Sequence, residues 1–201
     1  MNKRIELREL ANNQGGYFTA RQADALGFPS RKAKRFLDSG EWVREMTGIY
    51  RLAAVPLQDP GRDENHLWLL WSIGRKATKP RAALAYETVL SVYALSDLMP
   101  SKVHLSVPKS FKVFKLPKQL VLHREERPDS DITMFEGLRV IKLLQTIIDL
   151  LREGRVSREH IEKGFIEGIK KGYIRLNDVE DFKYKLSEKK LIKEWMRSAG
   201  W

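Results

Sequence analysis

Residues 27–40 read GFPSRKAKRFLDSG, and this stretch decides the fold that we expect for the N-terminal part of the chain. Gly27 suits the position that follows the end of a helix, and Pro29 prevents that helix from continuing. Ser30 is expected to cap the next helix, because its side-chain oxygen can accept a hydrogen bond from a first-turn amide. The stretch therefore predicts two helices joined by about four residues, which is the layout of a helix-turn-helix.

The second of these helices separates an apolar face from a basic one. At about 100° per residue, three apolar side chains fall on one face: Ala33, Phe36 and Leu37. The opposite face and its flank carry four cations: Arg31, Lys32, Lys34 and Arg35. A helix that reads the major groove needs this arrangement. Because arginine can hold guanine O6 and N7 together, we expect base contacts from the two arginines and phosphate contacts from the two lysines. A charged face that is simply solvated is the competing interpretation.

The flanking residues complete a winged helix-turn-helix in the prediction. Residues 5–11 predict a short first helix, and Thr19 is expected to cap a helix over 20–26. EWVREMTGIYRLA predicts a β-hairpin in which Gly48 supplies a positive φ. Three hairpin residues are candidates for contacts with the DNA backbone or minor groove: Arg44, Thr47 and Arg51. Two predicted caps are expected to present helix N-terminal amides to phosphates: Thr19 and Ser30.

The rest of the chain predicts a second, mixed domain. AAVPLQDPGRDEN carries two prolines and a glycine. We therefore place a linker at 57–65, between a DNA-binding domain at 1–56 and an α/β domain at 66–201. Predicted helices lie at 63–73, 83–95, 143–154, 157–172 (capped by Ser157) and 177–198 (capped by Asn177). Predicted strands lie at 102–108, 119–125 and on either side of Glu136-Gly137. The expected class is α+β, with a winged helix-turn-helix followed by a mixed domain whose C-terminal part is helical. In the last helix these residues are expected to pack inward: Leu186, Leu191, Ile192, Trp195 and Met196.

A second concentration of charge lies in residues 102–127, which hold seven Lys and Arg against two glutamates. Four of the lysines fall at every third position: Lys109, Lys112, Lys115 and Lys118. Phe111 and Phe114 lie between them, and aromatic rings beside cations can stack on bases. The segment is either a second basic surface for operator DNA, RNA or a toxin, or a lysine-rich loop that keeps an edge strand soluble.

The composition favours a protein that binds polyanions. The 201 residues include 37 Lys and Arg against 26 Asp and Glu, a net charge of +11, and such an excess attracts nucleic acid or an anionic surface. The absence of cysteine excludes disulfides and thiolate metal sites and fits a reducing compartment. We expect a cytoplasmic protein without a signal peptide or a membrane-spanning segment.

The sequence offers little for catalysis, so we expect no enzyme, no cofactor and no metal. The nucleotide-binding, hydrolase and zinc-protease motifs are missing. His104 and His123 are predicted to be ordinary strand residues. The enzyme alternative is a nuclease domain, which would need carboxylates and a lysine on a central strand to hold Mg²⁺. Glu188-Lys189-Lys190 has that spacing but lies in a predicted helix.

The N-terminal pattern GGYFTARQADALGFPSRKAKRFLDSGEWVREMTGIYRL resembles the winged helix of the AbiEi antitoxin family, the regulatory half of type IV toxin–antitoxin pairs. The matching features are Gly16, Phe18-Thr19, Gln22-Ala23, Gly27, the basic helix, Gly40, Arg44 and Gly48-Ile49-Tyr50-Arg51. The segments AALAYETVLSVYAL, KVHLSVPK, QLVLHRE and GLRVIKLLQTIIDLL follow in the order typical of the family.

The resemblance implies a DNA-binding antitoxin that represses its own operon. It also implies a C-terminal domain that counters a nucleotidyltransferase toxin, without requiring a stable complex. The expected partners are double-stranded promoter DNA and this toxin. Two alternatives stay open: a solitary winged-helix transcriptional regulator, and a basic interaction protein that binds RNA or a toxin directly.

Overall fold

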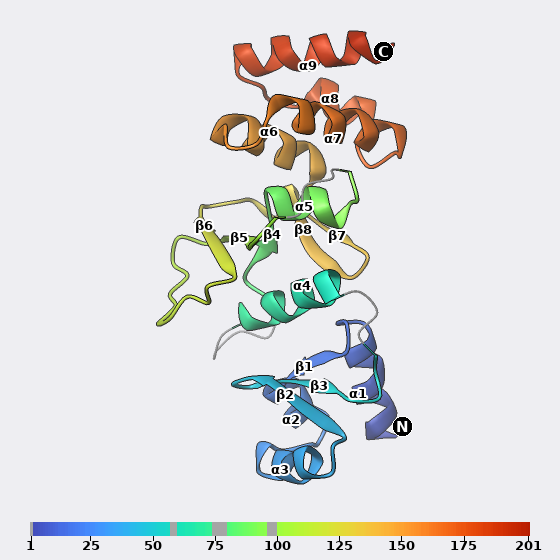
Figure 1. Ribbon diagram of the computed structural model, residues 1–201, viewed down its shortest axis with the longest axis vertical. Coiled ribbons are helices and arrows are strands. Elements are labelled where there is room, and N and C mark those ends of the chain that lie inside the picture. The colour runs from blue at the N-terminus through green and yellow to red at the C-terminus, as the bar shows by residue number, and fades with distance from the viewer. Residues whose placement is uncertain (1, 57–59, 74–79, 96–99) are drawn as a thin grey trace. The chain divides into compact units, whose positions relative to one another are not determined.

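The structure is a computed structural model that describes residues 2–56, 60–73, 80–95 and 100–201 (Figure 1). The chain forms two compact units. Unit 1 comprises Met1–Ala82 and Met134–Arg139, and unit 2 comprises Ala83–Thr133 and Val140–Trp201. The mixture of helices and strands confirms the predicted α+β class.

Unit 1 begins with helices arranged around a small sheet. Its elements are α1 (Lys3–Asn12), β1 (Tyr17–Thr19), α2 (Ala20–Ala25), α3 (Ser30–Asp38), β2 (Trp42–Met46), β3 (Ile49–Leu52) and α4 (Pro60–Trp71). The three strands are antiparallel in the order β1-β3-β2. The β2–β3 hairpin is the one predicted, and Gly48 supplies the positive φ of its turn, 79°.

The predicted capping chemistry explains where α2 begins and ends. The Thr19 hydroxyl accepts a hydrogen bond from the Gln22 amide at 3.2 Å, and the Gln22 side chain accepts one from the Thr19 amide at 2.8 Å. The Thr19 cap is the one predicted, and the reciprocal bond to Gln22 completes a capping box that the prediction did not include. Gly27 follows the helix with φ 84°, a conformation that costs glycine little.

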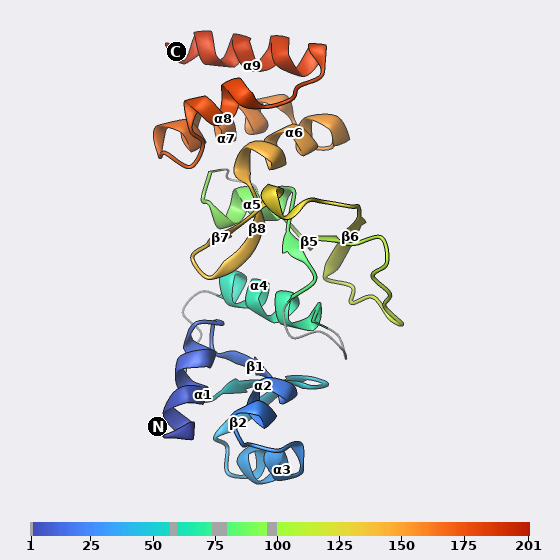
Figure 2. The same ribbon diagram turned by 180° about the vertical axis from the view of Figure 1, so that it is seen from behind.

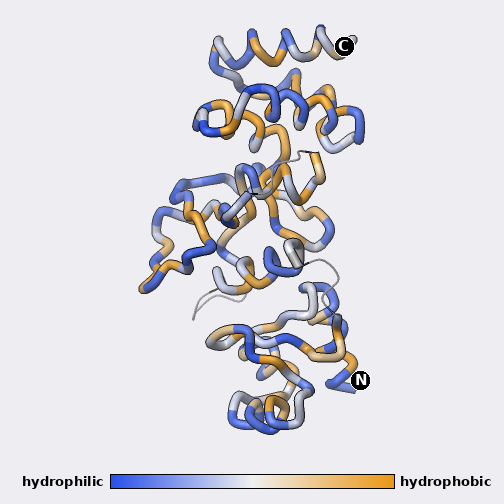
Figure 3. The backbone as a smooth tube through the Cα atoms, viewed as in Figure 1, coloured by the Kyte–Doolittle hydropathy of each residue, from blue (hydrophilic) through white to orange (hydrophobic). Residues whose placement is uncertain are grey.

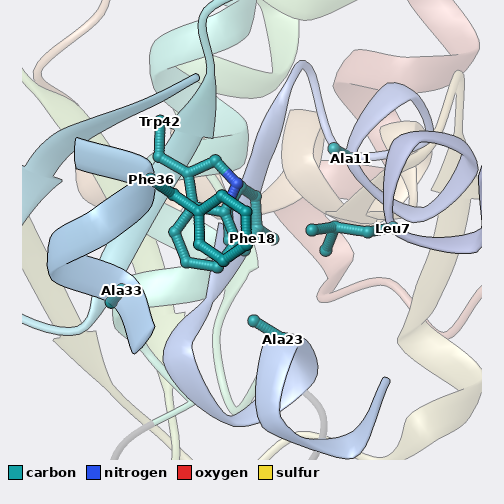
Figure 4. Packing of buried hydrophobic residues seen from close by; sticks show 7 residues of the cluster. All are labelled: Leu7, Ala11, Phe18, Ala23, Ala33, Phe36 and Trp42. Carbon is teal, nitrogen blue, oxygen red and sulfur yellow. The ribbon is translucent and has the colours of Figure 1, made fainter. Parts of the chain in front are cut away.

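An aromatic cluster forms the core of this N-terminal region (Figure 4). Its buried members come from α1, β1, α2, α3 and β2: Leu7, Ala11, Phe18, Ala23, Ala33, Phe36 and Trp42. The rings of Phe36 and Trp42 stack with centroids 4.6 Å apart, and Phe18 meets Trp42 edge-on at 4.8 Å. Trp42 therefore connects α3 to the sheet.

A five-stranded sheet runs in the order β6-β5-β4-β8-β7. Its strands are β4 (Ala83–Leu84), β5 (Val103–Val107), β6 (Leu120–Arg124), β7 (Ile132–Phe135) and β8 (Leu138–Ile141). β4 is antiparallel to β5 and parallel to β8, and β5 is parallel to β6. A short 3-10 helix, η1 (Asp129–Asp131), precedes β7. The strands predicted at 102–108 and 119–125 and the hairpin about Glu136-Gly137 are confirmed.

The helical part of unit 2 consists of α5 (Glu87–Val92), α6 (Leu143–Glu153), α7 (Arg158–Lys170), α8 (Leu176–Asp181) and α9 (Leu186–Ser198). α7 packs against α6 and α9 (Figures 1 and 2). Two glycines of α7 allow close approach, since a Cβ at Gly168 would lie 2.8 Å from a methyl carbon of Leu143. The Arg152 guanidinium donates to the buried Glu188 carboxylate at 2.8 Å, which ties α6 to α9.

Two element predictions between residues 57 and 95 are wrong in part. The linker expected at 57–65 is wrong from residue 60 onward, because α4 begins at Pro60, while 57–59 lie outside the described residues. The helix expected over 83–95 is β4 followed by α5. The first part of that run is buried between strand partners, and periodicity alone does not separate a buried strand from a helix.

The predicted helix over 177–198 is also wrong, because it is divided into α8 and α9. The backbone of Phe182 is extended, with φ −69° and ψ 137°, and this ends α8. Asn177 does not cap that helix, since Arg175 holds the N-cap position. Leu186 was expected to pack inward, but it begins α9 and is 88% exposed, whereas Ile192 and Trp195 are buried as predicted.

Candidate nucleic-acid interface

The basic helix α3 has the two faces that the sequence predicts. Ala33 and Phe36 are buried in the aromatic cluster, and Leu37 is half-buried against it. Four cations are exposed: Arg31, Lys32, Lys34 and Arg35. Within the described ranges, none of the four side chains has a carboxylate partner. Figure 3 shows α3 as a largely hydrophilic segment. The helix thus presents uncompensated positive charge from a position fixed by aromatic packing.

The start of α3 differs from the prediction in one respect. Ser30 is the first helical residue and not the cap, because Pro29 occupies the N-cap position with φ −62° and ψ 147°. Proline has no side-chain acceptor, so no side chain caps the helix. The Lys32 amide bonds to the Pro29 carbonyl at 2.7 Å. In the part of the chain that the structure describes, the amides of Ser30 and Arg31 have no acceptor. Two free N–H groups at the positive end of a helix dipole suit an anion.

The start of α2 is used inside the protein, so the expectation at Thr19 is wrong in part. The hydroxyl of Thr19 and the amide of Gln22 are both engaged in the capping box. The Ala20 amide donates to the Gly48 carbonyl at 2.8 Å. Two first-turn amides of this helix are therefore unavailable to a phosphate. The Ala20 bond connects α2 to the turn of the β2–β3 hairpin, and the Gln22 bond closes the capping box.

The predicted hairpin contacts divide into two kinds. Arg44 and Thr47 are exposed. Arg51 is half-buried, and its Nε donates to Glu45 Oε1 at 2.8 Å while Nη1 donates to the Val55 carbonyl at 3.4 Å. The bond to Glu45 joins β3 to β2, and the bond to Val55 holds the segment that follows β3. Arg44 and Thr47 remain the hairpin groups that can reach a ligand, and Arg51 supports the hairpin.

The second basic segment keeps its lysines exposed. Four residues lie in the connection between β5 and β6: Lys109, Lys112, Lys115 and Lys118. Arg127, which the sequence counted with them, is not part of this surface. Its side chain is 9% exposed, and Nη2 donates to Asp149 at 2.6 Å and to Glu125 at 2.8 Å. The burial of Asp149 raises the pKa of its carboxyl, and the Arg127 charge opposes this rise.

A histidine pair that the sequence treated as ordinary strand residues forms a contact between β5 and β6. Nδ1 of His104 lies 3.1 Å from Nε2 of His123 and 3.1 Å from Oε2 of Glu87. Tyr86, whose φ is 52°, stacks on His123 with centroids 3.8 Å apart. Burial lowers the pKa of His104, and burial together with His104 lowers the pKa of His123 to about 4. Both rings are therefore neutral near pH 7.

The pair was missed because it depends on strand register. Two histidines that are 19 positions apart meet only if β5 and β6 pair in parallel with His104 opposite Val121. In the described part of the chain, no three His, Asp or Glu side chains are arranged to hold a metal ion. The neutral imidazoles and the nearby carboxylate are a buried polar network.

In comparison with known proteins, the N-terminal part of the chain is similar to a class of regulatory proteins, antitoxins and transcriptional regulators. The family described as "Transcriptional regulator, AbiEi antitoxin" matches residues 6–53, which supports the AbiEi-type resemblance predicted from the sequence. The match runs from α1 to the residue after β3. No curated protein matches the chain. Among the described residues, every helix is too short or too polar to cross a lipid bilayer.

Proposed function

We propose that the protein is a winged helix-turn-helix repressor of its own operon and the antitoxin of a type IV toxin–antitoxin pair. The observation that carries this proposal is α3, whose four exposed cations have no carboxylate partner among the described residues and whose opposite face is held by the Phe36–Trp42 stack. The order α1, β1, α2, α3 and then the β2–β3 hairpin supports the winged-helix assignment.

The chemistry of α3 suggests how it reads DNA. Arg31 and Arg35 contact guanine edges in the major groove, because a planar guanidinium can donate to O6 and N7 at once. Lys32 and Lys34 neutralise phosphates, and the free amides at the start of the helix bind one further phosphate oxygen. Arg44 and Thr47 at the hairpin contact the neighbouring backbone or minor groove. Arg51 acts through Glu45, by holding the hairpin in place.

We assign the two activities to the two domains predicted from the sequence, although α4 begins inside the linker expected between them. Residues 1–56 bind promoter DNA, and residues 66–201 counter a nucleotidyltransferase toxin in the cytoplasm. The resemblance of the later segments to the family supports the second part. A solitary regulator would share the first part only.

Variants of the recognition helix test the DNA-binding proposal. Arg31→Ala and Arg35→Ala should each weaken binding to the upstream duplex by about 1–3 kcal/mol and relax base preference at one position. Lys34→Ala should weaken binding to all sequences and reduce the salt slope by about 0.9. Lys193→Ala, at an exposed position of α9, is the matched control. Unchanged affinity in both arginine variants would exclude the assignment of α3.

The toxin part needs a separate readout. The full-length Arg31→Ala/Arg35→Ala double variant should lose repression of a promoter reporter but still rescue growth when it is co-expressed with a nucleotidyltransferase encoded beside it. If the double variant loses repression but even the wild-type protein does not rescue growth, the function that remains is that of a solitary regulator. Rescue that is lost together with repression would contradict the proposed separation of the two activities.

A further inference from the structure

The connection between β5 and β6, residues 108–119, is anchored by contacts at both ends, and we name it the β5–β6 loop. Its start is fixed by the Lys109 amide, which donates to Glu126 Oε1 at 3.1 Å, and by the buried ring of Phe111. Its end is fixed where the Val103 amide donates to the Gln119 carbonyl at 2.8 Å. The loop lies beside β6 in both views (Figures 1 and 2).

Between these anchors the loop exposes an aromatic ring among cations. Phe114 is fully exposed, although Phe111, three residues earlier, is buried. The neighbouring lysines are exposed as well: Lys112, Lys115 and Lys118. In the described part of the chain no carboxylate pairs with any of them. A phenylalanine ring in water forgoes the gain of burial that Phe111 obtains. The combination therefore suits a ligand that offers both a flat apolar surface and negative charge.

We infer that the β5–β6 loop binds single-stranded nucleic acid. An unpaired base stacks on the ring of Phe114, and the flanking phosphates pair with Lys112, Lys115 and Lys118. Base–aromatic stacking beside a cationic track is how proteins hold single strands without sequence preference. A duplex does not fit as well, because its bases are already stacked and present no free face to Phe114. The inference does not rest on the proposed function, since it uses no residue of α3.

Two other occupants fit the charges or the ring less well. A second copy of the chain would bring its own lysines against these lysines if the two loops met, and like charges repel. An anionic membrane surface would accept both the ring and the lysines, but it would require no stacking geometry. Single-stranded nucleic acid uses the face of the ring and the charges together, so it is the occupant that we assign.

The test measures fluorescence anisotropy of the full-length chain with labelled oligothymidylate and oligouridylate of about fifteen nucleotides. A duplex of equal length is the comparison. Phe114→Ala should weaken single-strand binding by roughly five- to a hundredfold, whereas Phe114→Tyr, which keeps an aromatic face, should retain it. Lys112→Ala should lower the single-strand salt slope by about 0.7. Leu186→Ala, at an exposed apolar position of α9, is the control and should change nothing.

The outcomes separate this inference from the alternatives. Unchanged single-strand affinity in Phe114→Ala would overturn it, and so would an equal loss on the duplex. Binding of phosphatidylserine-containing vesicles that depends on Phe114, without single-strand binding, would assign the loop to a membrane surface instead. Phe114→Ala should weaken single-strand binding by the same factor in the wild-type and in the Arg31→Ala background, so failure of the repressor proposal and failure of this inference are distinguishable.

Discussion

Replacing Trp42 with alanine should remove a large part of the stability of unit 1. The Trp42 side chain is 5% exposed and lies at the centre of the aromatic cluster. Its ring centroid is 4.6 Å from that of Phe36, 4.8 Å from that of Phe18 and 5.5 Å from that of Tyr50. The substitution would therefore leave a cavity between α3 and the sheet.

The magnitude follows from the burial and the ring contacts. Removal of a buried Trp side chain costs about 3–5 kcal/mol of unfolding free energy. Because several favourable ring pairs are lost at once, we expect about 4 kcal/mol for Trp42→Ala. Domains are stable by only about 5–15 kcal/mol, so this loss is a large fraction of the total. Trp42→Phe keeps a ring against Phe36 and should cost about 1–2 kcal/mol.

Urea unfolding of the full-length chain, followed by far-UV circular dichroism, measures the effect. Two compact units give the chain two unfolding transitions if they unfold separately, and each is fitted by itself. Trp201→Ala, at a residue that is 40% exposed, is the control and should change the unfolding free energy by less than about 0.5 kcal/mol. A loss below about 1 kcal/mol for Trp42→Ala would refute the reasoning.

Three further predictions concern a turn, a titration and an ion pair. Gly48→Ala should lower the unfolding free energy in urea by about 1 kcal/mol. The φ of Gly48 is 79° and no atom lies within 4 Å of the added Cβ, so backbone strain is the whole effect. An unchanged unfolding free energy would contradict the positive φ at this turn. In the folded chain the pKa of His104 is lowered and that of His123 is about 4. The unfolded chain therefore binds more protons than the folded chain between pH 6.5 and about 4. The unfolding free energy should therefore fall as the pH falls through that window, and His123→Gln should lessen the fall between about pH 7 and pH 5; an identical slope would contradict the assignment. Arg152→Ala should lower the unfolding free energy by about 1–2 kcal/mol, because it removes the hydrogen bond that lowers the pKa of the buried Glu188 carboxyl. Lys189→Ala is the control in the same unfolding assay. An equal loss of unfolding free energy in the two variants would show that the Arg152–Glu188 ion pair does not stabilise the fold.

Features set by local chemistry could be predicted from the sequence. Thr19 and Gln22 form a capping box because the two side chains are three residues apart. Gly48 turns the hairpin because glycine tolerates positive φ. The inward face of α3 follows from the helical spacing of Ala33 and Phe36.

Features set by distant partners could not be predicted. β1 is three residues long and exists because it pairs with β3, whose residues are 30 to 34 positions away. Similarly, β4 has two residues and is defined by its neighbours in the sheet. The burial of Arg127 depends on Asp149 in another element. The count of cations over residues 102–127 therefore included Arg127, which does not belong to the second basic surface.

We propose above that the cations of α3 read a particular DNA sequence. The most direct test is binding of the full-length chain to a duplex from just upstream of its own gene and to a scrambled duplex, over about 50 to 200 mM salt. We expect the affinity for both duplexes to fall with salt and a preference for the upstream duplex to remain at the higher salt concentration. Equal binding that collapses for both duplexes would mean that α3 is a general polyanion surface, and it would contradict the proposed repressor.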